Sequence, residues 1–219
     1  MAKNYELEDT PEHLLARAYA LHGNDPDETR KLYSDWAETY DQTMLDGLSY
    51  SSPRRIAALA AVTEARRDVR VLDVGCGTGL LASCLRTQGF KRVDGLDYSA
   101  PMLAVAQREG RIDEAFLRDL NERLEMETEY YDLLVSTGTF THGHVQAGCL
   151  PELLELLVPE GRLICTVHRD IWDEGGFSNG LRALTEAGVA VVRSREAGCL
   201  FADEDEPSGW YLVVEKLAC

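Results

Sequence analysis

The sequence predicts an α/β fold: a Rossmann-like, doubly wound, mostly parallel seven-stranded sheet with an antiparallel C-terminal edge hairpin and an N-terminal helical cap. First, short apolar strand-like segments alternate with helix-like segments from residue 69 to about residue 187, which favours a parallel sheet with helices on both faces. Second, the segment at residues 69–74 ends in a glycine-rich turn at residues 75–79, as a nucleotide-binding βαβ unit does. Third, the last two strand-like segments have no helix between them, so we expect them to form a hairpin.

The N-terminal part of the chain is expected to be helical. Residues 11–22 and 26–44 carry helix-like patterns, and a third helix is expected at residues 52–67, where Ser-Pro opens it. These helices precede the first core strand and have no counterpart in the minimal fold. We therefore expect residues 1–67 to form a helical cap and residues 68–219 to form the α/β core, within one compact domain overall.

The core is expected to alternate strands with helices up to the final hairpin. Strands are expected at residues 69–74, 92–97, 115–117, 131–136, 161–168, 189–195 and 210–216. Helices are expected at residues 79–88, 99–109, 150–158 and 177–187.

The chain is acidic, with a formal net charge of −16 from 22 basic and 38 acidic side chains. Nucleic-acid binding depends on neutralising phosphates, so this charge argues against a nucleic-acid partner. Anionic membranes are poor partners for the same reason, and a small molecule is the better expectation. No run reaches the ~18 apolar residues of a membrane span, and the N-terminus lacks the pattern of a signal peptide. The six cysteines show no C-x-x-C pairing and are typical of free thiols, which favours a cytoplasmic protein.

The turn at residues 75–79 indicates the kind of cofactor. Its glycines have a G-x-G-x-G spacing, with Leu80 where a dinucleotide fingerprint has its third glycine. Asp73, just before the turn, would repel a phosphate and suit an ammonium group. Asp97 closes the next strand eighteen residues after Gly79, where a carboxylate accepts both hydroxyls of a ribose. Adenosine with an amino-acid tail and a sulfonium meets these demands, so we expect S-adenosyl-L-methionine.

The segment from Leu72 to Leu80 resembles motif I of the class I S-adenosylmethionine-dependent methyltransferases, and residues 97–103 resemble the next motif of that family. The resemblance implies that residues 68–219 form a class I methyltransferase core. Ligands of open α/β sheets lie outside the carboxyl ends of the strands. For the methionine part of the cofactor, the expected contacts are Asp73 and the backbone of Gly75, Cys76 and Gly77. Asp97 is expected to contact the ribose, and Tyr98 and Met102 the adenine. Thr137, after the fourth strand, is a further expected contact. The resemblance also implies that Asp119 accepts a hydrogen bond from the adenine amino group and that Leu120 offers its backbone; a turn acid is the alternative for Asp119.

Tyr33, Trp36 and Tyr40 are spaced to share one face of a predicted helix. Such an aromatic stripe is usually part of a core. The pattern Tyr-x-x-Trp-Ala-x-x-Tyr-Asp is, however, similar to that of many small-molecule methyltransferases, in which a capping helix lays these aromatics over the methionine end of the cofactor. The resemblance implies that Tyr33 and Tyr40 bind the cofactor and that Trp36 contacts the substrate.

Three histidines come after the fourth and fifth strands. His142 and His144 lie in a small, polar segment, and His168 precedes Trp172 by four residues. We expect His142 and His168 as candidate general bases, and His144 and Trp172 as substrate contacts. Imidazoles also bind zinc, but no acid or thiolate is clearly spaced to complete such a site, so no metal is expected. Surface histidines without a catalytic role are the remaining interpretation.

Further motifs extend the resemblance over most of residues 20–170, from His22-Gly23 to the block at residues 150–163. Together they resemble the Williams–Beuren syndrome region methyltransferase-like family. This implies an enzyme that transfers a methyl group from S-adenosylmethionine to a small-molecule acceptor and releases S-adenosylhomocysteine, with the acceptor and the oligomeric state left open. The alternatives are another transfer or an intramolecular reaction of the same cofactor, a non-catalytic cofactor-binding module, and a nicotinamide oxidoreductase.

Overall fold

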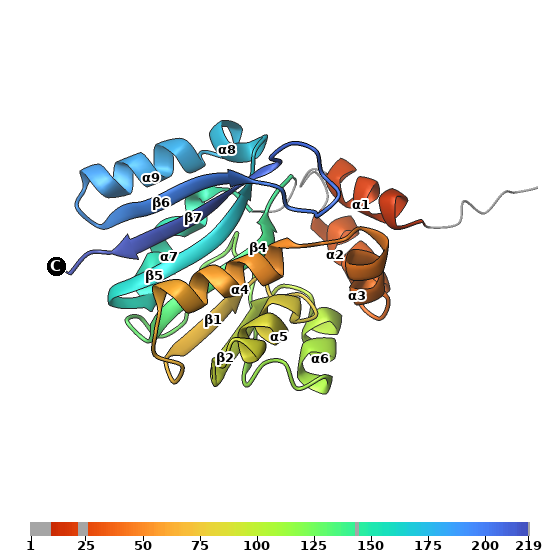
Figure 1. Cartoon of the computed structure of the whole chain (residues 1–219), viewed down its shortest axis with the longest axis horizontal. Helices are drawn as coiled ribbons and strands as arrows, with labels where there is room; N and C mark the ends of the chain where they lie inside the picture. The colour runs from red at the N-terminus through yellow and green to blue at the C-terminus, as the bar shows by residue number, and fades with distance from the viewer. Residues whose placement is uncertain (1–9, 22–25, 143–144, 219) are drawn as a thin grey trace, which may run out of the picture.

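The computed structural model describes residues 10–21, 26–142 and 145–218. Within these residues, seven strands form one sheet in the order β3-β2-β1-β4-β5-β7-β6 (Figure 1). Strands β1 to β5 are parallel, and β7 is antiparallel to both of its neighbours. The predicted fold class, with its antiparallel C-terminal hairpin, is confirmed. The strands are β1 (Arg70–Val74), β2 (Arg92–Asp97), β3 (Ala115–Leu117), β4 (Tyr131–Phe140), β5 (Leu157–His168), β6 (Ala190–Gly198) and β7 (Gly209–Lys216).

Both faces of the sheet are buried, and β1 shows why its sequence is so apolar. Val71 enters a core with Ile56 of α4 (Ser52–Thr63) and Leu85 of α5 (Leu80–Thr87). Leu72 enters a second core with Leu153 of α7 (Leu150–Leu156). Successive side chains of a strand point to opposite faces, so a strand covered on both sides needs apolar residues at consecutive positions. Each such side chain stabilises the fold by about 1.5–3 kcal/mol when it leaves water.

The core helices form two layers, one on each face of the sheet (Figure 1). α4, α5 and α6 (Ala100–Arg108) supply one core, and α7 and α9 (Phe177–Glu186) supply the other. Two short helices, η2 (Ala147–Cys149) and α8 (Ile171–Glu174), are additions to the predicted elements. β4 and β5 are longer than predicted, and α7 is shorter because Leu157 is already extended. None of the helices in the described residues has the length and apolar character needed to cross a bilayer.

The cap consists of α1 (Pro11–Ala20), α2 (Pro26–Trp36), α3 (Tyr40–Gln42) and the π-helical turn η1 (Thr43–Gly47), which stand together at one end of the sheet (Figure 1). The single helix predicted at residues 26–44 is broken, because the amide of Thr39 donates to the carbonyl of Trp36 (3.0 Å) in a tight turn. Buried side chains of Ala18, Leu32, Trp36, Met44 and Tyr50 hold the cap together.

The third predicted helix, α4, is shorter than expected and lies in a different layer. It ends at Thr63 because Glu64 is extended, with φ −125° and ψ 112°. Its buried face, including Ile56 and Ala60, packs on the sheet with Val71. The division of the chain at residue 67 therefore stays a prediction, and the helices over the strand ends are those before α4.

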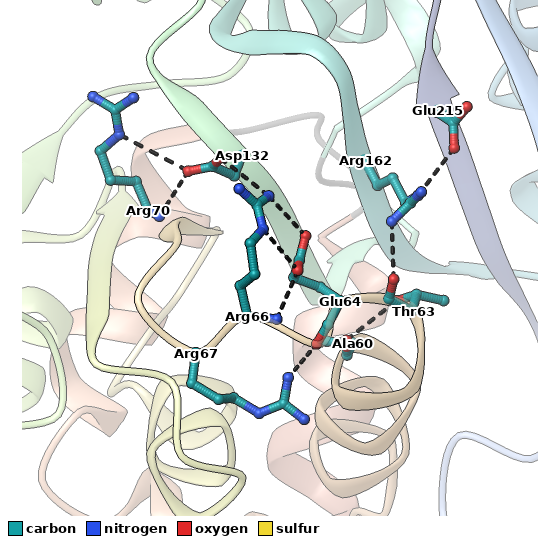
Figure 2. Close-up of polar contacts among 9 residues, drawn as sticks. All are labelled: Ala60, Thr63, Glu64, Arg66, Arg67, Arg70, Asp132, Arg162 and Glu215. Carbon is teal, nitrogen blue, oxygen red and sulfur yellow. Dashed lines mark hydrogen bonds and ion pairs between the residues drawn. The ribbon is translucent and has the colours of Figure 1, made fainter.

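A charged network fixes the opposite end of the sheet (Figure 2). The carboxylate of Asp132, at the start of β4, accepts a hydrogen bond from the backbone amide of Arg70 in β1 (2.9 Å). Arg162 of β5 donates to the carboxylate of Glu215 in β7 (3.0 Å) and to the carbonyl of Thr63 (2.9 Å). The first bond ties β1 to β4, and the other two tie the end of α4 to β5 and β7. All of them lie away from the carboxyl ends where a ligand is expected.

Candidate active site

The glycine turn is held against the end of β2 by backbone hydrogen bonds. The amides of Gly75 and Cys76 both donate to the carbonyl of Leu96, at 2.8 and 2.9 Å. Gly75 has a φ of +67°, and a Cβ there would lie 2.1 Å from Oγ1 of Thr139. Only glycine permits this conformation and this close approach of β4. The turn therefore presents backbone rather than side chains at the carboxyl ends of the strands.

Asp97 completes the turn from β2. Its buried carboxylate accepts hydrogen bonds from the backbone amides of Gly77 and Ser99, both at 2.8 Å. Burial raises the pKa of Asp97 to about 6, although these hydrogen bonds favour the ionised form. A carboxylate can accept about four hydrogen bonds, so Asp97 can also accept from the two hydroxyls of a ribose.

A cavity of about 1510 Å³ opens at these strand ends. Ligand pockets are commonly about 300–1,000 Å³, so this one has room for a cofactor and a second molecule together. The predicted site residues that line it are Tyr33, Tyr40, Gly75, Gly77, Asp97, Tyr98, Met102, Asp119, Leu120, Thr137 and His142.

The part of the cavity beside β2 and β3 is where the predicted adenosine contacts lie. Tyr98 and Met102 line it, and the buried Tyr98 hydroxyl has no hydrogen-bond partner among the described residues. Asp119 also lines it, while its carboxylate accepts from the amide of Asn121 (2.9 Å) and pairs with Arg30 (3.7 Å). A turn role and a cavity position are therefore compatible for Asp119. An aromatic ring, an apolar side chain and a few polar groups are the usual surroundings of such a ligand.

The aromatic stripe divides between the cavity and the cap core. Tyr33 and Tyr40 line the cavity, with their ring centroids 6.4 Å apart. Burial raises the pKa of both hydroxyls well above the ordinary value, so both stay protonated and can donate to a carboxylate. Trp36 is not in the cavity lining: its indole N–H donates to Oγ1 of Thr43 (3.2 Å) inside the cap. The structure thus places the side chain predicted to touch a substrate in the cap core.

Four further predicted residues also lie outside the cavity lining: Asp73, Cys76, Trp172 and His168. The buried carboxylate of Asp73 accepts from the amide of Ala82 in the first turn of α5 (3.1 Å). Burial raises the pKa of Asp73 to about 8, so this group is mostly neutral at pH 7 and does not supply the expected negative charge. The Cys76 thiol is buried in the core on one face of the sheet, and the half-buried Trp172 packs against the core on the other face. His144, predicted to contact the substrate, lies outside the described residues.

A clamp that the sequence patterns did not indicate joins the cap to the glycine turn. Asp41 of α3 accepts from Oγ1 of Thr78 (2.5 Å) and from the guanidinium of Arg111 (2.6 Å). Arg111 also donates to the carbonyl of Thr78 (3.0 Å). The position of Asp41 directly after Tyr40 in the aromatic motif was the available signal. The clamp holds the cap over the turn without lining the cavity itself.

Two of the predicted histidines meet where β4 and β5 end. The ring centroids of His142 and His168 are 4.4 Å apart, and only His142 of the pair lines the cavity. Oδ2 of Asp170 lies 3.2 Å from Nε2 of His142 and 3.8 Å from Nδ1 of His168. The ring of Tyr19, from α1, packs against both imidazoles at 5.3 and 6.0 Å. Asp170 was missed from sequence, where its short spacing from His168 was the only signal.

The surroundings of His168 favour its neutral form. Burial, followed by the neighbouring His142, lowers the pKa of His168. A neutral imidazole can accept a proton or bind a ligand through its free nitrogen.

Comparisons with known proteins agree with this geometry. Residues 72–165, from β1 into β5, match a family model described as a methyltransferase domain. The chain is 36% identical over 161 residues to methyltransferase-like protein 27 of Homo sapiens. The aligned region covers 70% of this chain and 63% of that protein. It is 35% identical over 113 residues to malonyl-[acyl-carrier protein] O-methyltransferase of Enterobacter lignolyticus. That aligned region covers 52% of this chain and 44% of the relative. The predicted resemblance to a methyltransferase-like family is confirmed.

A solved structure shows the same fold. The TehB-like methyltransferase from Corynebacterium glutamicum superposes with a TM-score of 0.63 at 20% identity, over 84% of this chain and 97% of that one. At this identity the likeness is one of fold alone. The chain spans less than two thirds of the length of the two curated relatives named above.

Proposed function

The chain carries the fold and the domain sequence of the class I S-adenosylmethionine-dependent methyltransferases, and from this premise we propose that it transfers a methyl group from S-adenosylmethionine to a small-molecule acceptor. The second product is S-adenosylhomocysteine. One observation carries the proposal: the glycine turn and the Asp97 carboxylate are hydrogen-bonded to each other beside a cavity with room for two molecules.

Each end of the cofactor has a proposed set of contacts. The aminoacyl tail lies on the backbone of the 75–79 turn, where Tyr33 and Tyr40 donate to its carboxylate. Asp97 accepts from the ribose hydroxyls, since its position at the end of β2 is typical of a ribose-binding acid. Adenine lies among Tyr98, Met102, Asp119 and Leu120, and Thr137 contacts the cofactor from β4.

We propose that the acceptor occupies the remaining part of the cavity, between residues 137–142 and residues 171–175. The net charge of −16 supports a small molecule over a nucleic acid, whose phosphates would be repelled. Relatives named as O-methyltransferases support an oxygen atom as the nucleophile. The substrate contact assigned to His144 stays a prediction.

Methyl transfer requires alignment more than covalent chemistry from the protein. When bound, S-adenosylmethionine supplies a methyl group on a sulfonium, which is an activated leaving group. The turn and the cap hold one reactant, and the cavity wall orients the other for in-line attack. A hydroxyl acceptor must also lose a proton. We propose that His142 and His168 act as general bases that remove this proton, because their imidazoles meet at the acceptor end of the cavity.

We also propose a cytoplasmic location. The five cysteines that the structure describes are all unpaired. Free thiols persist in a reducing compartment, whereas secreted proteins commonly form disulfides.

The test begins with binding of S-adenosylhomocysteine, measured by calorimetry. Asp97→Asn removes a charge that accepts from two hydroxyls, and hydrogen bonds to charged groups contribute about 1.5–3 kcal/mol each. We therefore expect at least about tenfold weaker binding, since about 1.4 kcal/mol is tenfold. Asp94→Asn is the matched control: Asp94 lies on the same strand, accepts from the Tyr131 hydroxyl (3.0 Å) and is outside the cavity lining.

Turnover is then measured with a panel of phenols, alcohols, amines and thiols. Release of S-adenosylhomocysteine supports methyl transfer, whereas release of methylthioadenosine points to another transfer. Tight cofactor binding with no turnover across the panel would favour a non-catalytic module. Thermal stabilisation by NAD and not by S-adenosylmethionine would replace the proposal with an oxidoreductase.

A further inference from the structure

We propose that His142, His168 and Asp170 bind one divalent transition-metal ion at the acceptor end of the cavity. The site combines the end of β4, the end of β5 and the residues just before α8. Its position beside an acceptor rests on the proposed function, whereas ion binding itself does not.

The spacing of the donor atoms fits one ion. Oδ2 of Asp170 is 3.2 Å from Nε2 of His142 and 3.8 Å from Nδ1 of His168, and one donor atom from each residue lies within 4.8 Å of the others. Around zinc, with bonds of ~2.0–2.2 Å, neighbouring ligand atoms in a tetrahedron lie ~3.3–3.6 Å apart. The two distances from the exposed Asp170 carboxylate, 3.2 and 3.8 Å, lie on either side of that range.

The sheet places the two imidazoles together before any ion binds. Phe140 of β4 pairs with Val167 of β5, so residues 142 and 168 leave neighbouring strands at the same edge. Tyr19 then packs against both rings and limits their movement. Ligands positioned by strands and held by a packed aromatic ring need little rearrangement to bind an ion.

The donor set selects the class of ion. Two imidazoles and one carboxylate suit first-row transition metals, whereas magnesium and calcium prefer oxygen ligands alone. Nδ1 of His168 accepts a long hydrogen bond from the amide of Asp170 (3.3 Å), so this nitrogen carries no proton. A histidine must be in this state to bind a metal, and the ion would replace the long hydrogen bond.

With both imidazoles bound to the ion, the ion rather than a histidine base would promote loss of the acceptor's proton. His142 lines the cavity, and three protein ligands leave at least one coordination position open. A hydroxyl that coordinates there releases its proton to solvent at a lower pH. Its oxygen then forms the bond to the methyl carbon, while the carbon–sulfur bond breaks and its electron pair stays on sulfur. This favours acceptors in which a hydroxyl lies next to a second oxygen donor.

Calorimetric titration of the metal-free full chain with Zn²⁺, Co²⁺ and Mn²⁺ tests the site, and visible absorption reports the coordination of Co²⁺. We expect one ion per chain and tighter binding of Co²⁺ than of Mn²⁺. His142→Ala, His168→Ala and Asp170→Ala should each weaken Co²⁺ binding at least about 100-fold, because loss of an outer-shell partner alone costs roughly 10–100-fold. Asp173→Ala, at an exposed acid in α8, should bind Co²⁺ as the wild type does.

Each outcome decides the proposal. Absence of saturable binding by the wild type overturns it and leaves a metal-free pair of histidines with Asp170. Binding that survives in all three variants also overturns it, because other groups such as thiols would then hold the ion. Circular dichroism shows whether each variant is folded. Titration with S-adenosylhomocysteine separates the two proposals: a chain that binds Co²⁺ but no adenosyl ligand refutes the proposed function and leaves the metal site in place.

Discussion

Replacing Asp41 by alanine should weaken cofactor binding, although Asp41 is not expected to touch the cofactor. Its carboxylate accepts from the Thr78 hydroxyl (2.5 Å) and the Arg111 guanidinium (2.6 Å). These bonds join α3 of the cap to the glycine turn and to the loop after α6. The substitution therefore removes a connection between the cap, which carries Tyr33 and Tyr40, and the turn.

The size of the effect depends on the exposure of the pair. Hydrogen bonds to charged groups contribute about 1.5–3 kcal/mol. The side chains of Asp41 and Arg111 are 27% and 20% exposed, and solvent screening reduces the value of such a pair. We therefore expect a loss of about 1–2 kcal/mol, which corresponds to a factor of about 5–30 in an equilibrium constant. If cofactor binding requires the cap to lie over the glycine turn, the dissociation constant of S-adenosylhomocysteine rises by this factor.

Calorimetry on Asp41→Ala and Glu38→Ala checks the reasoning. Glu38 also joins the cap to α6, through an ion pair with Arg108 (2.9 Å), but both side chains are exposed. Exposed pairs contribute little, so Glu38→Ala should bind S-adenosylhomocysteine like the wild type. Unchanged affinity in Asp41→Ala would refute the coupling of the cap to the cofactor site, and an equal loss in both variants would show that general destabilisation of the cap is the cause.

Two further predictions concern stability. Burial raises the pKa of Asp73 from an ordinary 3.8 to about 8. Between these two pH values, the folded state holds a proton that the unfolded state releases. The free energy of unfolding should therefore fall as pH rises through this range. Urea denaturation at about pH 5 and about pH 9 should show a smaller fall in Asp73→Asn, and an equal fall would contradict the assignment. Asp132→Ala leaves the amide of Arg70 without its acceptor (2.9 Å) and should lower the free energy of unfolding by about 1–3 kcal/mol. The affinity for S-adenosylhomocysteine should not change, because this network lies at the other end of the sheet; a loss of affinity would argue against that separation.

The direction in which each side chain of β1 points explains which residues near the glycine turn could be predicted from the sequence and which could not. The turn and Asp97 were identified because local spacing determines their positions. Asp73 points elsewhere than expected, since it shares a strand face with Val71, and Val71 packs against α5. Its carboxylate therefore meets the first turn of that helix, where the amide of Ala82 needs an acceptor. The closeness of Asp73 to the glycine turn in the sequence suggested a ligand contact. The alternation of side chains along β1 instead directs Asp73 toward α5.

The cap was predicted less well because its form depends on tertiary contacts. The break after Trp36 accompanies the packing of its ring against Tyr40, at 4.9 Å between centroids, which the helical spacing of these residues does not reveal. The apolar face of α4 around Ile56 would suit a cap or a sheet equally, and only the packing against Val71 decides it. Asp170 was missed for a related reason, because its place beside His142 depends on the pairing of β4 with β5.

The two ends of the cavity differ in how they are held, and this bears on how the acceptor is chosen. At the cofactor end, the amide of Gly75 and the carboxylate of Asp97 form hydrogen bonds that also join β1 to β2, so a change there disturbs the sheet. At the acceptor end, Tyr19, His142 and Asp170 come from three segments that meet mainly through side chains. Substitutions there can alter the chemistry of the wall while the strands stay in place. Relatives that share the glycine turn but differ at these three positions should therefore bind the same cofactor and methylate different acceptors.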